Sequence, residues 1–258
     1  MSKPAKSTAK NSGNIYIGIG GWTFEPWRGV FYPEKLTQAK ELSYAASKLT
    51  SIEINGTYYG SQKPESFRKW AREVPDGFVF SLKGPRFATN RRVLAEAGDS
   101  VKRFYDSGVL ELGDRLGPVL WQFAPFKKFD RDDIAGFIDL LPQEIDGIRV
   151  RHAIEPRHKS FDDEKFFELC TARNIAIVLE DSDDYPAIDA DTADFAYARL
   201  QRMSEELPTG YEDAALDGFA EKARKWIEGG RDAYIFMING AKVRAPAAAL
   251  ALQERLRV

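Results

Sequence analysis

The feature that most constrains the fold is a regular alternation of short apolar segments with longer segments of helical periodicity. The apolar segments have the length and the β-branched and aromatic content of strands. They are residues 15–20, 51–55, 78–82, 118–123, 151–155, 175–179, 195–199 and 233–238. Several of them, such as 175–179, are apolar at nearly every position. This pattern is typical of parallel strands that are buried on both faces.

Helical patterns lie between these strands. We expect helices at residues 38–49, 63–73, 101–112, 131–140, 163–173, 213–228 and 246–257. Eight strands that alternate with helices in 258 residues favour an α/β chain folded as a (β/α)8 TIM-barrel-like domain. A dinucleotide-binding open sheet is disfavoured, because Gly18-Ile19-Gly20-Gly21 lacks the glycine spacing of that motif.

Two segments depart from a regular barrel. The link 181–194 is short and acidic and contains Pro186, so we expect a distorted barrel whose sixth helix is missing or short. Residues 1–14 are polar, with three lysines, and predict a disordered N-terminal tail. Residues 15–258 are then expected to form a single domain.

Composition excludes several classes of function. The net charge of −2 gives no overall basic footprint for nucleic acid. Cys170 is the only cysteine and there are two histidines, which excludes intramolecular disulfides and multi-histidine metal clusters, and we expect no cofactor. No run of 18 apolar residues predicts a membrane span, and the polar start lacks the apolar core of a signal peptide. A cytoplasmic location is therefore expected.

Five sequence blocks occur in the order in which one known family carries them. They are Gly20-Gly21-Trp22 with Trp27-Arg28-Gly29 and Phe31-Tyr32-Pro33; Ile52-Glu53-Ile54-Asn55 with Thr57-Tyr58-Tyr59; Phe80-Ser81-Leu82-Lys83-Gly84-Pro85-Arg86; Leu116-Gly117-Pro118-Val119-Leu120 with Gln122; and Ala153-Ile154-Glu155-Pro156-Arg157-His158. Through these blocks, over about residues 16–199, the chain resembles the domain-of-unknown-function 72 (YecE-like) family. The resemblance implies a TIM-barrel-like fold and a cytosolic protein, and it implies no defined reaction.

The C-terminal quarter departs from the family pattern. The seventh strand of the family typically ends in Arg-Leu-His-Gly, and Gln201 stands here at the histidine position. At the eighth strand Asn239 is kept, whereas Gly240 and Pro246 replace the second and the later asparagine. An activity that needed the imidazole and the amides would be impaired, which favours a non-catalytic relative.

In a barrel, side chains at the C-terminal ends of the strands meet around one pocket. The candidate catalytic residues at these ends are Glu155, Glu53 and His158. The candidate substrate-binding residues are Lys83, Arg86, Gln122, Arg157, Arg199, Asn239, Asn55, Trp22 and Tyr58. We expect no metal ligands, because the acidic run 180–184, which could offer Asp181, is more typical of a solvated loop.

Two of these groups leave alternatives open. Glu155 can act as a general base and His158 as a proton donor, or His158 can cap the turn that follows while Arg157 pairs with a carboxylate. Glu53 shares the lumen face of its strand with Asn55, and Lys83 is its natural partner. These two form either a buried ion pair or a catalytic pair.

Three functions follow, of which the first is favoured. It is a barrel enzyme that uses acid–base chemistry on a small polar or anionic substrate, with Glu53 and Glu155 moving protons while Lys83, Arg157 and Arg199 hold charge. The first alternative is a non-catalytic barrel that binds a small molecule or regulates. The second is a metal-dependent nucleic-acid phosphodiesterase, which the acidic balance and the two histidines disfavour. The oligomeric state is left open.

Overall fold

Parallel strands of the computed structural model, which describes residues 12–257, form a nearly closed barrel. The barrel strands are β1 (Ile15–Gly20), β2 (Ser51–Ile54), β3 (Val79–Lys83), β4 (Leu116–Gln122), β7 (His152–Glu155), β8 (Ile175–Ile177), β9 (Leu179–Asp181), β10 (Phe195–Leu200) and β11 (Asp232–Met237). Their order in the sheet is β8-β7-β4-β3-β2-β1-β11-β10-β9. The expected TIM-barrel-like α/β fold is confirmed.

The two ends of the nearly closed barrel meet at its sixth strand, which is interrupted at Val178. β8 and β9 stand at opposite ends of the sheet order, yet they are consecutive segments of the chain. The amide of Val178 donates to the carbonyl of Ile154 at 2.9 Å, so the first part of this strand stays on β7 while β9 pairs with β10. The sequence predicted one continuous strand here, and a change of partner splits it into two.

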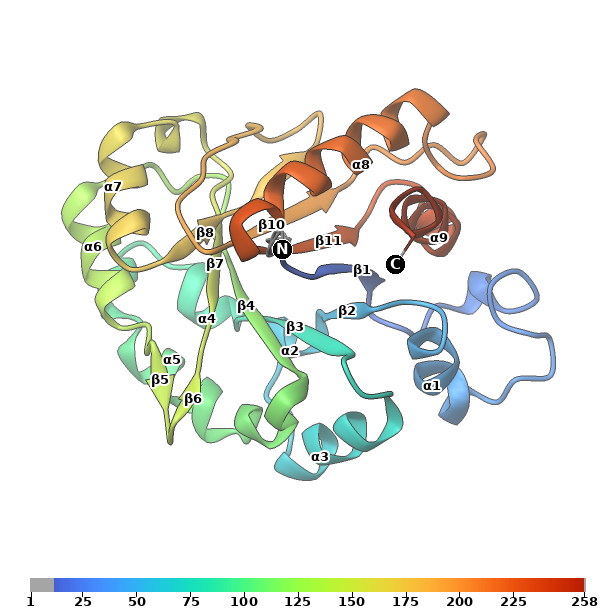
Figure 1. Cartoon of the computed structure of the whole chain (residues 1–258). Helices are drawn as coiled ribbons and strands as arrows, with labels where there is room; N and C mark the ends of the chain where they lie inside the picture. Colours follow the sequence, from blue (N-terminus) through green and yellow to red (C-terminus); the bar gives the residue numbers. More distant parts are fainter. Residues whose placement is uncertain (1–11, 258) are drawn as a thin grey trace, which may run out of the picture.

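The helices surround the strands, with α6 and α7 on one side and α8 and α9 on another (Figure 1). They are α1 (Glu41–Ala46), α2 (Gly56–Tyr59), α3 (Pro64–Glu73), α4 (Arg86–Thr89), α5 (Gly98–Asp106), α6 (Arg131–Asp139), α7 (Glu164–Ala172), α8 (Asp213–Trp226) and α9 (Ala245–Leu256). Asp130 caps α6 by accepting from the amides of Asp132 and Asp133. None of the described helices is long and apolar enough to cross a membrane.

The link between β9 and β10 carries no helix in the described structure, as its composition predicted. Thr192 in this link donates its hydroxyl to the carbonyl of Ile175 at 2.7 Å, so a loop side chain covers the β8 backbone. An additional two-stranded hairpin, β5 (Glu144–Ile145) and β6 (Ile148–Arg149), was not expected. Its turn residues Asp146 and Gly147 both have positive φ, which is the Asp-Gly signal of a tight hairpin.

The start of the described chain is held by the barrel. The amide of Gly13 donates to the carbonyl of Ile227 at 3.0 Å, and the amide of Asn14 donates to Asp232 Oδ1 at 2.9 Å. Residues 13 and 14, which the sequence placed in a disordered tail, are therefore held by hydrogen bonds to the barrel just before β1 begins. Residues 1–11 of that expected tail lie outside the described residues.

Two separate cores pack on the two faces of the strands. Ala196, Ala198 and Leu200 of β10 face the helices and belong to the larger core. Phe195 and Tyr197 of the same strand face the lumen, where they pack in a smaller aromatic core. Arg199 continues this inward row, because alternate residues of a strand share a face. The lumen thus changes from aromatic to charged toward the C-terminal ends of the strands.

Candidate functional site

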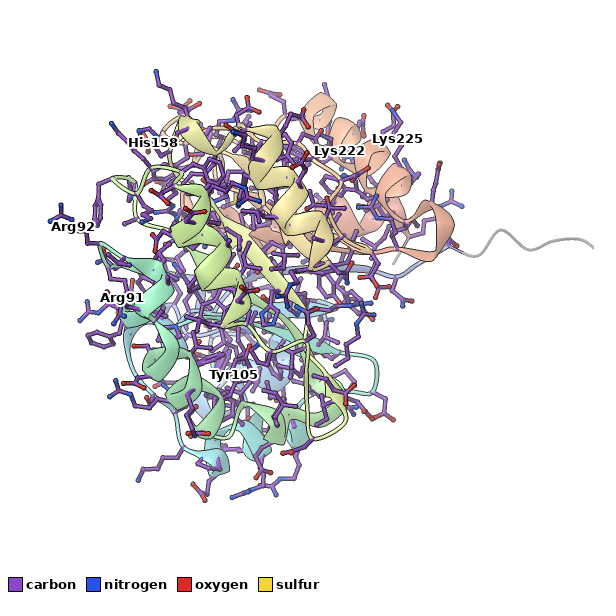
Figure 2. The ribbon with its side chains drawn as sticks, turned by 90° about the vertical axis from the view of Figure 1, so that its left-hand side faces the viewer. Arg91, Arg92, Tyr105, His158, Lys222 and Lys225 are labelled. Atoms are coloured by element: carbon purple, nitrogen blue, oxygen red, sulfur yellow. The ribbon has the colours of Figure 1, made fainter. Side chains whose placement is uncertain are left out.

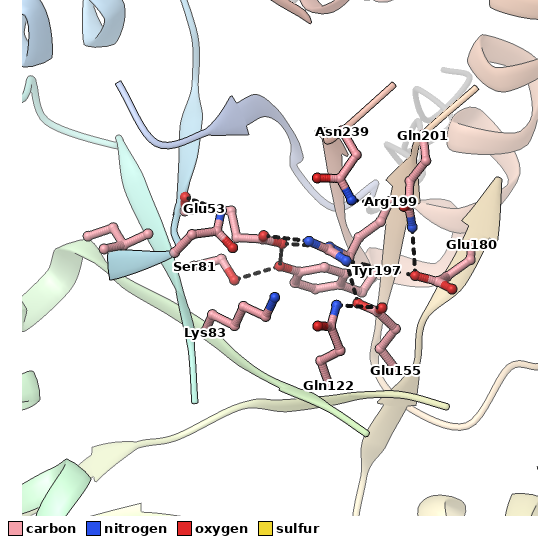
Figure 3. A network of polar contacts seen from close by, with 12 residues as sticks. Glu53, Ser81, Lys83, Gln122, Glu155, Glu180, Tyr197, Arg199, Gln201 and Asn239 are labelled. Carbon is pink, nitrogen blue, oxygen red and sulfur yellow. Dashed lines mark hydrogen bonds and ion pairs between the residues drawn. The ribbon is translucent and has the colours of Figure 1, made fainter. Parts of the chain in front are cut away.

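Arg199 lies at the centre of a buried ion network (Figure 3). Its Nε and Nη2 donate to the two carboxylate oxygens of Glu53 at 3.1 and 3.0 Å. Its Nη1 donates to Glu155 Oε2 at 2.6 Å. The three side chains are at most 1% exposed, so this guanidinium joins β10 to β2 and β7 in the lumen. We call Glu53, Glu155, Arg157, Glu180 and Arg199 the buried ion network.

Glu155 is held by three donors. Besides Arg199, its Oε1 accepts from Gln122 Nε2 and from Arg157 Nε, both at 2.7 Å. Although burial opposes its charge, the Arg199 guanidinium, a hydrogen bond with the Glu180 carboxyl and the charge of Arg157 hold the pKa of Glu155 well below its usual range. Glu155 is therefore ionised and fully paired at neutral pH.

Glu180 is the protonated member of the network. Its carboxyl accepts from Gln201 Nε2 at 2.7 Å, and the guanidinium of Arg199 lies 3.7 Å away. Burial, reinforced by the negative charge of Glu155, raises the pKa of Glu180 far above its ordinary value. One proton is thus kept between these two carboxyl groups, because two neighbouring buried carboxylates cannot both ionise cheaply.

Two hydroxyls complete the network on the side of β3. The hydroxyl of Tyr197 donates to Glu53 Oε2 at 2.7 Å. Ser81 Oγ lies 2.7 Å from the same hydroxyl and donates to the carbonyl of Pro118 at 2.9 Å. Together with Arg199, this hydroxyl gives each carboxylate oxygen of Glu53 at least one donor, which allows the charge of Glu53 to stay buried.

Lys83 ends β3 and faces the same region without joining the ion pairs (Figure 3). Its side chain is buried, and its Nζ stands 4.2 Å from the ring centroid of Tyr58. Burial, with the positive charge of Arg199 next in importance, lowers the pKa of Lys83 to about 8. An amine of this kind titrates close to neutral pH, where an ordinary lysine is fully protonated.

A cavity of about 770 Å³ opens above the network at the C-terminal barrel mouth. Four cationic side chains and no carboxylate line it among the described residues. The cationic residues are Lys83, Arg157, Arg199 and Lys242. The aromatic residues of the lining are Trp22, Trp27, Tyr58, Tyr59 and Trp70. A positively charged floor with an aromatic wall is suited to a small anion that carries an apolar or planar part.

Comparison with known protein families covers nearly the whole chain. The family model described as "Protein of unknown function DUF72" matches residues 16–258. The chain belongs to the DUF72 family. The match continues through the C-terminal quarter, beyond the sequence blocks that indicated the resemblance.

Curated relatives match part of the chain. The UPF0759 protein YunF of Bacillus subtilis (strain 168) is 26% identical over 159 residues, which are 60% of this chain and 54% of YunF. The UPF0759 protein YecE of Escherichia coli (strain K12) is 29% identical over 140 residues, 54% of this chain and 48% of YecE. The chain spans about half the length of the curated relatives it matches.

Solved structures agree with the DUF72 assignment. A DUF72 family protein from Thermotoga maritima MSB8 superposes with a TM-score of 0.77 at 26% identity, covering 95% of this chain and 100% of that one. One from Enterococcus faecalis V583 gives a TM-score of 0.76 at 17% identity, with 95% and 96% covered. The 3-keto-D-glucoside 4-epimerase YcjR from E. coli superposes with a TM-score of 0.53 at 12% identity, covering 95% of this chain and 100% of that one. This likeness shows a shared fold alone.

The structure divides the site residues that the sequence predicted into three groups. The first group lines the cavity: Lys83, Gln122, Arg157, Arg199, Asn239, Asn55, Trp22 and Tyr58. Glu53 and Glu155 form the second group, which lies beneath the lining and is 0% exposed. Arg86 and His158 form the third group and do not line the cavity. Their roles in chemistry stay predictions, since placement alone does not assign a reaction.

The two residues of the third group lie toward the surface. His158 lies at the edge of the molecule (Figure 2), where its Nδ1 accepts from the amide of Ser160 at 3.1 Å and caps a short turn. This is the capping alternative that the sequence left open. Arg86 is exposed beside the ring of Phe87 at the start of α4.

Two expectations about the lumen were wrong. The direct Glu53–Lys83 ion pair does not form among the described side chains, because the guanidinium of Arg199 occupies both oxygens of Glu53. The acidic run is not a solvated loop where it begins: Glu180 joins the buried ion network, and Asp181 accepts from the hydroxyl of Tyr211 and from Arg202. Among the described residues, no group of three or more His, Cys, Asp or Glu side chains is placed to hold a metal ion.

The sequence also missed Lys242 and Trp70. Lys242 follows β11 and stands 4.6 Å from the ring of Phe24, while Trp70 comes from α3 and packs against Trp22 at 5.3 Å. Neither residue ends a strand, so the rule that side chains at strand ends meet at the barrel mouth did not predict them. A lysine shortly after the last strand was the one available indication.

Two residues at which this DUF72 chain departs from the family pattern have a defined structural role. Gln201 bridges the network, donating to Glu180 and accepting from Asn239 Nδ2 at 3.0 Å. Gly240 has a φ of +54°, and a Cβ at this position would lie 2.3 Å from the carbonyl oxygen of Gln201. The backbone here has therefore no room for a second asparagine side chain.

Proposed function

We propose that this DUF72 protein is an enzyme that binds a small anionic substrate at the C-terminal barrel mouth and acts on it by acid–base chemistry. The observation that carries the proposal is the composition of the cavity, whose described lining has four cationic side chains and no carboxylate. Such a cavity favours an anion over a neutral or cationic molecule.

The charge balance of the site supports an anionic substrate. Glu53 and Glu155 neutralise two of the four lining cations, and Glu180 carries no charge when protonated. The remaining excess is two positive charges while Lys83 is protonated. Because the whole chain carries −2, this local excess has to attract the substrate without long-range help.

Lys83 is the group that we assign to proton transfer. It lines the cavity, and its pKa of about 8 allows it to accept or donate a proton near neutral pH. Glu53 and Glu155 have their oxygens occupied by guanidinium, amide and hydroxyl donors. In this proposal they are positioning residues, which fix Arg199 and Arg157 under the substrate.

The experiment is calorimetric titration with inorganic phosphate, pyruvate and citrate, with glycerol and glucose as neutral comparisons. We expect binding of at least one anion, weakened by added salt, and none of the neutral compounds. Lys242→Gln should weaken that binding roughly tenfold, since a charge-assisted contact is lost, whereas Lys48→Gln on the outer surface should not. Equal binding of anions and neutral compounds would contradict the proposal.

Turnover separates the enzyme from the first alternative, a barrel that binds or regulates. Bound anions are followed by NMR for conversion at pH 6 to 9, and the rate should rise as Lys83 loses its proton near pH 8. Binding without conversion would favour the non-catalytic barrel. The phosphodiesterase alternative lacks support in the described residues, where the carboxylates of the site are engaged by guanidinium groups and no metal-ligand set is assembled.

A cytoplasmic location is retained as a proposal, supported by the buried, unpaired thiol of Cys170. Fractionation of the producing cell tests it, and recovery of the protein outside the cytoplasm would contradict it. The proposed partner is the small anion itself.

A further inference from the structure

Lys83 is an unusual lysine for the inside of a barrel. Buried lysines are rare and are normally paired with a carboxylate. Among the described residues no carboxylate oxygen lies within 4.0 Å of Lys83 Nζ. The nearby carboxylates are paired with Arg199, which donates to both oxygens of Glu53 and to one oxygen of Glu155. The ammonium group instead lies over the face of the Tyr58 ring. A structural ion pair therefore does not explain this residue.

The position of Lys83 is suited to attack on a bound molecule. It ends β3 and lines the cavity together with Arg157 and Arg199, and its Nζ stands over the ring of Tyr58. Burial and the charge of Arg199 lower its pKa to about 8, so a large fraction of the amine is neutral under mildly alkaline conditions. A lysine that is desolvated beside another cation is an activated nucleophile.

We propose that the amine of Lys83 forms a Schiff base with the carbonyl carbon of a small anionic aldehyde or ketone. The inference rests on the proposed function, because the cationic lining has to hold the anionic group of the same compound. The shared chemistry is a carbonyl group next to a carboxylate or a phosphate, as in 2-oxo acids and keto phosphates.

The step balances without a further reactant. The lone pair of Nζ attacks the carbonyl carbon, and the π pair moves to oxygen, which takes the proton that nitrogen loses. The hydroxyl of this carbinolamine leaves with a second nitrogen proton as water, and the C=N bond forms. The imine nitrogen then takes up one proton from water, and the protonated C=N group withdraws electrons from the adjacent carbon. The reaction class is therefore proton removal or carbon–carbon cleavage beside the former carbonyl.

The test is trapping of the imine in the intact wild-type protein. Pyruvate and dihydroxyacetone phosphate are each added with sodium cyanoborohydride at pH 8, and the modified lysine is located by peptide mass spectrometry. We expect one reduced adduct, on Lys83. Lys48 is the internal comparison, because its Nζ also stands over a tyrosine ring, at 5.8 Å, but on the outer surface.

At pH 8 the neutral fraction of an amine with a pKa of about 8 exceeds that of an ordinary lysine by about 100-fold. Labelling of Lys83 should exceed that of Lys48 by a ratio of this order. The probe that labels Lys83 faster at equal concentration identifies the carboxylate or the phosphate as the preferred anionic group. Equal labelling of the two lysines would overturn the proposal.

Two variants complete the test. Lys83→Arg keeps the positive charge but cannot form an imine, and it should remove the adduct. Lys48→Arg should leave the adduct unchanged. Phosphate binding without any adduct on Lys83 would overturn the Schiff base and leave the proposed function standing. Absence of both binding and adduct would overturn both.

Discussion

Arg199 and Glu53 lie 146 residues apart in the sequence, and they meet in the barrel lumen through two parallel hydrogen bonds of 3.1 and 3.0 Å. This fork-to-fork geometry is the strongest form of a guanidinium–carboxylate pair. Because Arg199 also donates to Glu155, one side chain neutralises two buried carboxylates that come from different strands. The buried ion network therefore depends on Arg199 more than on any other member.

Arg199→Met should be strongly destabilising. The substitution leaves the buried carboxylates of Glu53 and Glu155 without their shared guanidinium partner, and breaking a buried pair in this way costs about 3–5 kcal/mol. Urea unfolding at pH 7 measures the change in the free energy of unfolding. The control is Arg149→Met, because Arg149 pairs with Asp194 at the exposed surface and should lose no more than about 1 kcal/mol. Similar losses in both variants would contradict the assigned role of the network.

Lys83→Met should make the protein more stable at pH 7. The native pKa of Lys83 lies at about 8, below the value of 10.5 for a free side chain, so its protonated form is disfavoured by folding. Removing this buried cation should therefore increase the free energy of unfolding, by about 1–3 kcal/mol. Lys48→Met, on the outer surface, should change it by less than about 0.5 kcal/mol.

The gain should depend on pH with a fixed sign. Between pH 8 and 10.5 the unfolded chain binds more protons at Lys83 than the native chain does, so the stability of the wild type rises with pH in this window. The advantage of Lys83→Met should accordingly be smaller at pH 9.5 than at pH 7. An advantage that grows with pH would show that Lys83 is stabilised by a partner.

His152 should make the protein sensitive to acid. Its Nδ1 accepts from Trp121 Nε1 at 3.0 Å and its Nε2 lies 2.7 Å from the carbonyl oxygen of Pro142, which the neutral ring satisfies. Burial lowers its pKa from 6.5 to about 4. As pH falls through this window the unfolded state takes up the proton first, so about 3 kcal/mol of stability should be lost.

Unfolding free energies measured from pH 7 to pH 4 test this. His152→Gln should flatten the dependence on pH, whereas His158→Gln should retain it because His152 is still present. An unchanged slope in the His152 variant would assign the acid sensitivity to other groups.

Gly240→Ala should cost more than an equivalent substitution at Gly229. Both glycines have positive φ, so both variants share the penalty of the left-handed region, about 1–2 kcal/mol. Only at position 240 would the new Cβ collide with a backbone oxygen, whereas it meets open space at position 229. The additional overpacking should cost about 1–3 kcal/mol in urea unfolding. Equal losses would show that the loop after β11 adjusts freely.

The outline of the barrel was readable because it depends on local patterns. Buried parallel strands are apolar along their length, which located the strands in the sequence. The order of the strands followed from the rules of connection between parallel strands. Pro186 indicated that the sixth unit lacks a full helix. The hairpin at Asp146 and Gly147 was missed although its turn signal stands in the sequence. The split of the sixth strand was not readable, since it results from a change of hydrogen-bonding partner at Val178.

Within the site, eight of the side chains expected at the mouth line the cavity, but the sequence did not predict how the charges pair. Alternation along a strand determines that Glu53, Glu155 and Arg199 face the lumen, and this is a local property. The distances across the lumen decide which carboxylate pairs with which cation. Arg199 reaches Glu53 and Glu155, whereas Lys83 lies over the ring of Tyr58. The sequence by itself thus determined the barrel fold and which strand-end side chains face the lumen, whereas the places of Lys242 and Trp70 in the lining came only from the tertiary structure. Only the tertiary structure decided which charges are neutralised, because ion pairing and burial depend on contacts between strands that are distant in the chain.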